Sequence, residues 1–96
     1  MGIVISKKIS EKLASKHSVT EAEVDQCFAN VEGKFLLDPR EEHQSDPPTK
    51  WFIAPTNGGR ALKVVFIVEN GNIYLRTAFP PNEEEVRIYN KYGARG

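Results

Sequence analysis

The amino-acid sequence lacks most of the features that mark a familiar functional class. Its 96 residues include one cysteine, Cys27, so the chain can form no internal disulfide and holds no cysteine cluster for zinc. No apolar run approaches the length of about 20 residues that a membrane-spanning helix needs. Basic and acidic residues balance at 13 each, whereas tight nonspecific nucleic-acid binders usually show a clear basic excess. The composition therefore leaves room only for a local basic face.

Motifs of several enzyme classes are also missing. The chain has no nucleophile elbow, phosphate-binding loop, dinucleotide fingerprint or zincin motif. His43 stands among Glu41, Glu42 and Asp46, but this spacing matches no known metal motif, so we expect no metal and no cofactor. Residues 1–8 contain too short an apolar part for a signal peptide, and their charges follow that part. We therefore expect a cytoplasmic protein without a membrane segment.

What the chain does contain is a run of strand-forming residues between positions 49 and 79. Asn57-Gly58 and Asn70-Gly71 divide this run, and Asn-Gly tolerates the positive φ of tight hairpin turns. The pattern predicts an antiparallel meander, to which a short strand over 34–38 adds a fourth member. The three strands of the meander are predicted at 49–56, 60–69 and 72–79.

Three helices are predicted around this sheet. Residues 6–17 form the first, with a thin apolar stripe. The second begins at Thr20, where Glu23 completes a capping box, and Gly33 is expected to end it. Asn82 caps the third helix, and Gly93 is expected to end it.

Together these elements predict a single α+β domain over residues 1–96, with the helices on one face of a four-stranded antiparallel sheet. Residues 1–5 could add a short edge strand. Residues 39–48 are polar and hold three prolines, so they form either a mobile surface loop or part of a binding edge. Residues 93–96 are expected to fray.

The face of the meander opposite the helices is the candidate site. Strand alternation places Tyr74, Arg76 and Ala78 on one face, and we expect this face to be open. An arginine can stabilise the charge that develops on a phosphodiester, and a tyrosine can stack on a base. A solvated sheet face with long side chains over apolar neighbours explains the same residues equally well.

The sequence leaves two possible roles open for each of His17 and Trp51. His17 could act as an acid or base near neutral pH, or it could cap the last carbonyls of the first helix. Trp51 could belong to the core or stack on a base, because alternation leaves open which of Trp51 and Phe52 faces outward.

Several short segments resemble the BrnT-like toxins, which are small bacterial proteins with a RelE-like ribonuclease fold. The similarity begins with Lys16-His17-Ser18-Val19-Thr20, directly before an amphipathic helix. It continues through the strand segments 59–66 and 71–79, and through Glu85 and Tyr89 in the last helix. These motifs cover the chain from about residue 9 to about residue 92.

The resemblance implies the toxin of a type II toxin–antitoxin pair, which inhibits translation and growth by cleaving RNA without a metal. Its partner would be a cognate antitoxin, and any contact with DNA would pass through the antitoxin complex. Metal-free cleavage needs cationic support for the phosphate and groups that move protons. The residues that we assign to catalysis are Arg60, Arg76, His17, Lys50 and Tyr74. The residues that we expect to contact RNA are Lys16, Lys63 and Trp51.

A second hypothesis keeps this fold without catalysis, as a protein-interaction or inhibitor module. Two observations favour it. The family's arginine at the end of the last strand is replaced by Phe79, and residues 18–46 carry eight acidic residues. Such a module would bind a protein partner and cleave no RNA.

Overall fold

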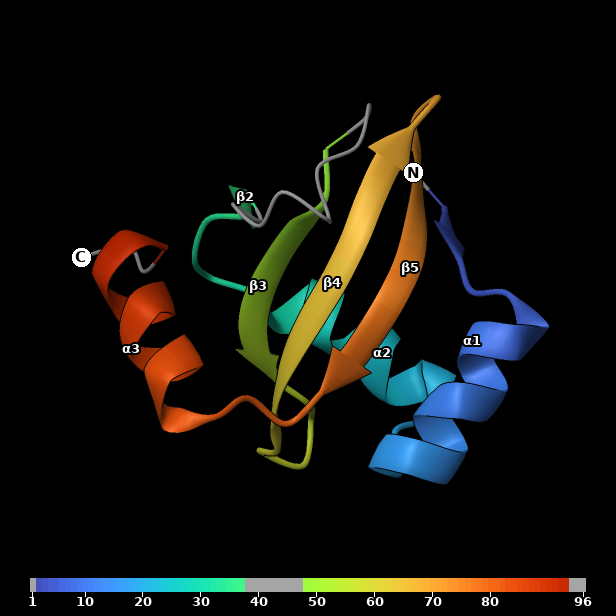
Figure 1. Cartoon of the computed structure of the whole chain (residues 1–96), viewed down its shortest axis with the longest axis horizontal. Coiled ribbons are helices and arrows are strands. Elements are labelled where there is room, and N and C mark those ends of the chain that lie inside the picture. The colour runs from blue at the N-terminus through green and yellow to red at the C-terminus, as the bar shows by residue number, and fades with distance from the viewer. Residues whose placement is uncertain (1, 38–47, 94–96) are drawn as a thin grey trace.

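The computed structural model describes residues 2–37 and 48–93, and the expected loop and frayed tail lie almost wholly outside these ranges. Three long strands form the centre, with helices on either side (Figure 1). In chain order the elements are β1 (Ile3–Val4), α1 (Lys7–Lys12), the π-helix η1 (Leu13–His17), α2 (Glu21–Asn30), β2 (Leu36–Leu37), β3 (Lys50–Pro55), β4 (Ala61–Glu69), β5 (Asn72–Phe79) and α3 (Glu83–Tyr92).

The sheet has five strands in the order β1-β5-β4-β3-β2. The meander of β3, β4 and β5 is antiparallel, as predicted. Asn70-Gly71 carries the expected positive φ, but in the first hairpin turn the positive φ falls at Gly59 and not at Asn57-Gly58. The prediction of four antiparallel strands is wrong in one respect, because β1 pairs parallel to β5 and makes the sheet mixed. A strand of two residues joins a partner about 70 positions away, and nothing local in its sequence specifies that pairing.

Both faces of the sheet are covered, which corrects the prediction that all helices lie on one face. On one face the Phe28 ring of α2 packs edge-on against Phe52 and Phe66, with ring centroids 4.9 and 5.3 Å away. Trp51 points to the other face by strand alternation and contacts Tyr89 of α3 at 5.7 Å. α3 therefore lies over the β3 side of the second face, and the β5 side of that face has no helix above it (Figure 1).

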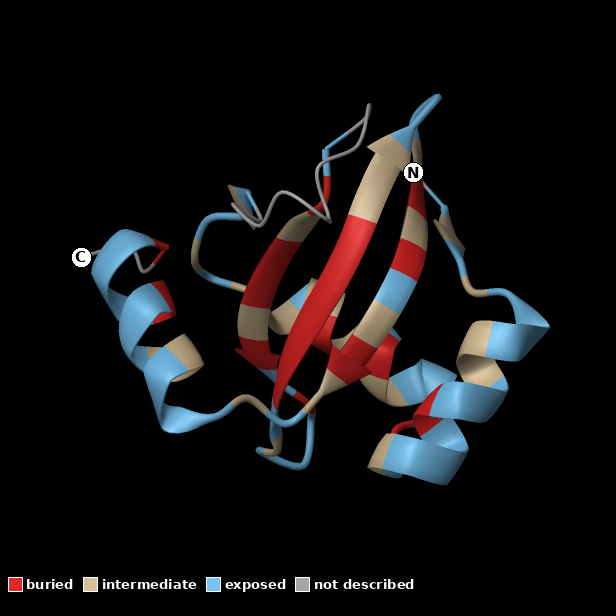
Figure 2. Ribbon diagram, viewed as in Figure 1, coloured by how far each residue is buried: buried red, intermediate tan, exposed pale blue. Residues whose placement is uncertain are grey.

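The hydrophobic core lies mainly between the sheet and the helices α1, η1 and α2 (Figure 2). Phe52, Phe66 and Leu62 are fully buried there, as are Val24 and Cys27 of α2. The capping box of Thr20 and Glu23 forms as predicted and fixes the start of α2. A second capping box starts α3. No helix within the described residues is long and apolar enough to cross a membrane.

A β-bulge interrupts the alternation on β5. Val65 pairs with Thr77 while the next residue, Phe66, pairs with Leu75, so Arg76 is an extra residue on β5. Leu75 and Ala78 consequently both lie in the core, at 5% and 0% exposure. This corrects the predicted grouping of Ala78 with Tyr74 and Arg76 on one open face.

Gly33 does not end α2, contrary to the prediction. The helix ends at Asn30, and the extended Val31 follows it. Gly33 instead lets α3 approach, because a Cβ built there would collide with the Tyr89 hydroxyl and lie 2.7 Å from the Gly93 carbonyl oxygen. The Tyr89 hydroxyl donates a hydrogen bond to the Lys34 carbonyl at 3.0 Å, and the Lys34 amide donates to the Gly93 carbonyl.

Replacing Gly33 with alanine is therefore expected to lower the free energy of unfolding by about 2 kcal/mol, the usual cost of overpacking a close contact. Urea denaturation followed by tryptophan fluorescence measures the effect, since Trp51 lies against Tyr89. Gly58→Ala is the matched control, because its Cβ would meet only the Thr56 hydroxyl, at 3.8 Å. Equal stabilities of the two variants would contradict the proposed role of Gly33.

Candidate functional site

A groove runs between α1 and β5, at the side of the sheet that α3 does not cover. Its volume is about 540 Å³. Its lining combines an apolar floor with charged walls. The lining residues are Ser6, Lys8, Ile9, Lys12, Ile67, Glu69, Tyr74, Leu75 and Arg76.

Local structure explains how these side chains meet. The pairing of β1 with β5 is parallel, so the chain leaves β1 and enters α1 alongside the next residues of β5. Ser6 caps α1 by accepting a hydrogen bond from the Ile9 amide at 3.2 Å. Lys8 and Lys12 lie one helical turn apart on the groove side of α1. The bulge on β5 adds Arg76 to the opposite wall, since a bulged residue leaves the regular alternation.

The electrostatics of the groove favour an anion. The side chains of Lys8, Lys12 and Arg76 form no hydrogen bond or ion pair with any described residue, and all three residues are exposed. These three cations outnumber the one carboxylate of the lining, Glu69, and an anion bound between them would reduce their mutual repulsion. Tyr74 lines the same groove and pairs with Ile67 on β4.

Lys16 and His17 lie at the end of η1, next to the end of β5 and beyond the groove. The His17 ring packs against Phe79 at the end of β5, with ring centroids 5.6 Å apart. Phe79 lies three positions beyond Arg76 on β5, a distance of about 10 Å along the strand. His17 is therefore a neighbour of the groove and does not line it.

Arg60 lies outside the groove and holds the corner between η1 and α2. Its guanidinium donates to the carbonyls of His17 and Ser18, at 2.8 Å each, and approaches the Glu23 carboxylate at 3.5 Å. Ser18 needs this support, because it has a left-handed backbone with φ of 53°. These three contacts use three of the five N–H donors of the guanidinium and give it a role in holding the backbone.

Lys63 and Trp51 also have partners within the protein. Lys63 donates to the Glu85 carboxylate at 2.6 Å and lies 4.5 Å above the Trp51 ring. Lys63 is 9% exposed and Trp51 is 6% exposed, beneath α3. In this arrangement neither side chain reaches the surface on which we expected RNA to bind.

Lys50 belongs to a different part of the sheet. It begins β3, pairs with Phe66 on β4 and lies two strands away from β5. Alternation places Lys50 on the same face as Phe52, which is the face that the N-terminal helices cover. The structure therefore brings together Tyr74 and Arg76 from the predicted site, with His17 and Lys16 nearby, and leaves Lys50 apart.

Lys8 and Lys12 are the residues that the sequence reasoning missed. A signal was present, since residues 1–17 hold four lysines and one acidic residue. Their place beside β5 depends on the parallel pairing of β1, which local patterns do not reveal. No group of three or more potential metal ligands occurs within residues 2–37 and 48–93, and His43 lies outside these ranges.

Cys27 and Tyr89 are the buried titratable groups of the core. The pKa of the Cys27 thiol is raised to about 11, chiefly by burial and also by the nearby Glu23, while Arg60 opposes the shift. The thiol donates to the Ala54 carbonyl at 3.4 Å. Burial also raises the pKa of Tyr89. Both groups are protonated at neutral pH, and Cys27 is an inert core thiol.

This shift predicts an alkaline loss of stability. The folded protein keeps the Cys27 proton to a higher pH than the unfolded chain, whose ordinary thiol pKa is 9.0. The stabilisation is complete below pH 9 and is lost as the pH rises towards 11, by about 2–3 kcal/mol. Urea denaturation at pH 8, 9 and 10 measures the slope. Cys27→Ala should show a clearly shallower slope, and equal slopes would contradict this assignment.

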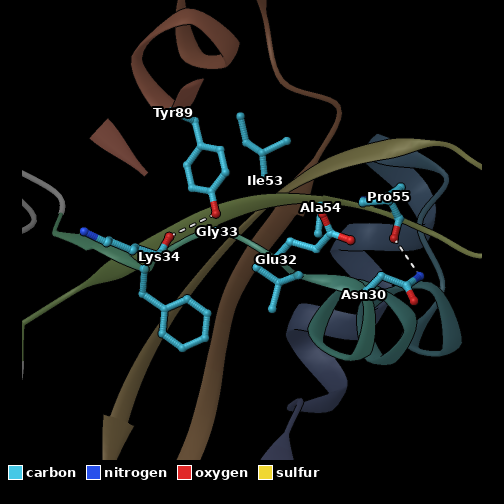
Figure 3. Close-up of a pocket in the computed structure, with 10 residues that line it drawn as sticks. Asn30, Glu32, Gly33, Lys34, Ile53, Ala54, Pro55 and Tyr89 are labelled. Atoms are coloured by element: carbon cyan, nitrogen blue, oxygen red, sulfur yellow. Dashed lines mark hydrogen bonds between the residues drawn. The ribbon is translucent and has the colours of Figure 1, made fainter. Parts of the chain in front are cut away.

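A second and larger groove, of about 1120 Å³, lies at the opposite side of the sheet, between α2, β3 and α3 (Figure 3). Phe35, Ile53 and Tyr89 contribute its apolar surface. The Asn30 side chain donates to the Pro55 carbonyl at 3.0 Å and so satisfies part of the β3 edge. Lys34 is the basic residue of this lining and Glu32 the acidic one, so this groove has no excess of positive charge.

The described residues define an α+β domain with three α-helices and a five-stranded mixed sheet. A crystal structure of the Brucella abortus ribonuclease toxin, BrnT, has a similar fold, with a TM-score of 0.60, and the match covers 86% of this chain and 99% of that one. The two chains are 15% identical, so the likeness shows the fold and leaves the activity to be argued from the site. No protein-family model matches the sequence. No curated protein matches it either.

Proposed function

We propose that this chain is an RNA-directed toxin that inhibits growth by cleaving RNA without a metal ion. The observation that carries the proposal is the groove that Arg76, Lys8 and Lys12 line together with Tyr74, with no ion pair between these cations and the described residues. The likeness in fold to a ribonuclease toxin supports it. Free cations next to an aromatic ring match the needs of a phosphodiester and its base.

The residues take separate roles in this proposal. Arg76 stabilises the charge that develops on the phosphate, and Lys12 supports it from α1. Cleavage by the neighbouring 2′-hydroxyl needs one group to take its proton and one to protonate the leaving oxygen. Tyr74 and His17 are the candidates for these transfers, because Tyr74 lines the groove with Arg76 and His17 packs against Phe79 at the end of the same strand. Lys16, directly before His17 in η1, adds a further positive charge on that side of the groove.

The other predicted residues receive structural roles. Arg60 fixes the backbone that carries His17, and Lys63 with Trp51 anchors α3 on the sheet. We further propose that the protein acts in the cytoplasm of a bacterium and is neutralised by a cognate antitoxin.

Inducible expression in a bacterium tests the function directly. The proposal expects growth arrest together with decay of cellular RNA, and cleavage of single-stranded RNA by the purified protein in the presence of EDTA. Normal growth at a high level of folded protein, with no cleavage by that protein in vitro, would rule the function out.

The larger groove favours a second candidate, a non-catalytic module that binds a protein. Phe35 and Leu37 lie at that side of the sheet with 45% and 61% exposure. This candidate predicts saturable binding of a protein partner that survives Arg76→Ala and weakens in Leu37→Asp, with no RNA cleavage at any concentration. The same measurements therefore separate the two candidates.

A further inference from the structure

One residue of the α1–β5 groove opposes the binding of an anion. Glu69 lines the groove together with Lys8, Lys12 and Arg76. It forms no ion pair with them, since the ion pairs among the described residues are Arg60–Glu23 and Lys63–Glu85. A carboxylate that neither neutralises these cations nor binds a phosphate is a hydrogen-bond acceptor without a partner in the groove.

The pairing register of β4 and β5 sets the order of Glu69, Tyr74 and Arg76 along the groove. Glu69 pairs with Asn72, Ile67 pairs with Tyr74, and Arg76 follows at the bulge. Each step of two residues advances about 7 Å, so acceptor, aromatic ring and cation follow one another over about 14 Å. A nucleotide presents its groups in the same order, from the edge of the base through its plane to the phosphate.

We propose that Glu69 is a specificity-determining residue that selects guanine in the groove. This inference rests on the proposed action on RNA. Guanine offers two adjacent donors on its Watson–Crick edge, N1–H and the 2-amino group, which together match the two oxygens of a carboxylate. Adenine and cytosine offer one amino donor beside an acceptor nitrogen, and the N3–H of uracil lies between two carbonyl acceptors. In single-stranded RNA this edge is free to be read, with the base stacked on Tyr74.

Binding of uridine nonamers that carry one central G, inosine, A or C tests the proposal. The nonamers are 2′-O-methylated so that they cannot be cleaved, and fluorescence anisotropy gives their dissociation constants. We expect the wild-type protein to bind the G nonamer about tenfold more tightly than the A, C and all-U nonamers, the usual discrimination of a bidentate contact. Inosine keeps N1–H and lacks the 2-amino group, so it should fall between them.

Glu69→Gln should reduce the preference for G to less than twofold, while binding of the all-U nonamer stays equal or becomes tighter. Glu84→Gln removes the same charge from an exposed position on α3 and should leave the preference intact. Equal binding of all nonamers by the wild-type protein, or an unchanged preference in Glu69→Gln, would overturn the assignment. Guanine-selective binding without cleavage of unmodified RNA would overturn the proposed function and leave this inference standing, whereas no binding of any nonamer would overturn both.

Discussion

Replacing Arg76 with alanine is expected to abolish growth inhibition and to slow RNA cleavage by about 100- to 1,000-fold, the usual loss when one group that stabilises transition-state charge is removed. Folding stability should change by less than about 0.5 kcal/mol, because Arg76 is exposed and forms no hydrogen bond or ion pair with the described residues. The loss should therefore appear in activity alone.

Single-turnover cleavage of a fluorescent oligonucleotide and urea denaturation measure these two effects. Arg87→Ala removes an exposed arginine from α3 and serves as the control, with unchanged activity. Arg76→Lys should retain part of the activity, since it keeps the charge and loses the fork of donors. Full toxicity of the Arg76→Ala variant would contradict a catalytic role for Arg76.

Replacing Arg60 with alanine is expected to have a large effect of the opposite kind. The free energy of unfolding should fall by about 2 kcal/mol, because two backbone carbonyls and the Glu23 carboxylate lose their donor. The partial exposure of this side chain, 35%, keeps the loss below that of a fully buried pair. Activity should decline as well, since His17 loses its support.

Arg60→Lys distinguishes this role from phosphate binding. A single ammonium group cannot serve both carbonyls, so lysine should restore less than half of the lost stability. Urea denaturation of the two variants beside Arg87→Ala provides the comparison. If Arg60→Ala kept full stability and lost activity as Arg76→Ala does, Arg60 would belong to the chemistry.

The sequence predicted those parts of the fold that short-range interactions determine. Asn70-Gly71 has the positive φ that the sequence required, whereas the first turn has its positive φ at Gly59, one residue after Asn57-Gly58. The three strands of the meander form as predicted. The predicted capping box at Thr20 and the predicted N-cap at Asn82 both form. Each of these features depends on residues no more than a few positions apart, so a local pattern contains the necessary information.

Long-range packing determined the rest. The side of the sheet on which α3 lies depends on Gly33, Tyr89 and Trp51, which come from three distant parts of the chain. The bulge at Arg76 arises from the register between β4 and β5, which strand alternation alone does not predict. Sequence periodicity therefore assigned the wrong face to Ala78 and missed the place of α1.

The candidate site divides in the same way. Tyr74 and Arg76 were predicted from composition and alternation, and the structure brings them together in one groove. Arg60 and Lys63 carry the same charge as Arg76, but their partners lie 37 and 22 positions away in the sequence. A cation free to bind a ligand and a cation held in an ion pair have the same one-dimensional signature, so only the fold separates them.

The location of the RNA-binding surface is the central claim, and amide NMR during titration with a 2′-O-methylated oligonucleotide tests it most directly. We expect the shifted resonances to cluster at Lys8, Lys12, Tyr74 and Arg76, with smaller changes towards His17. Shifts confined to the groove between α2, β3 and α3, or no shifts at all, would contradict the account.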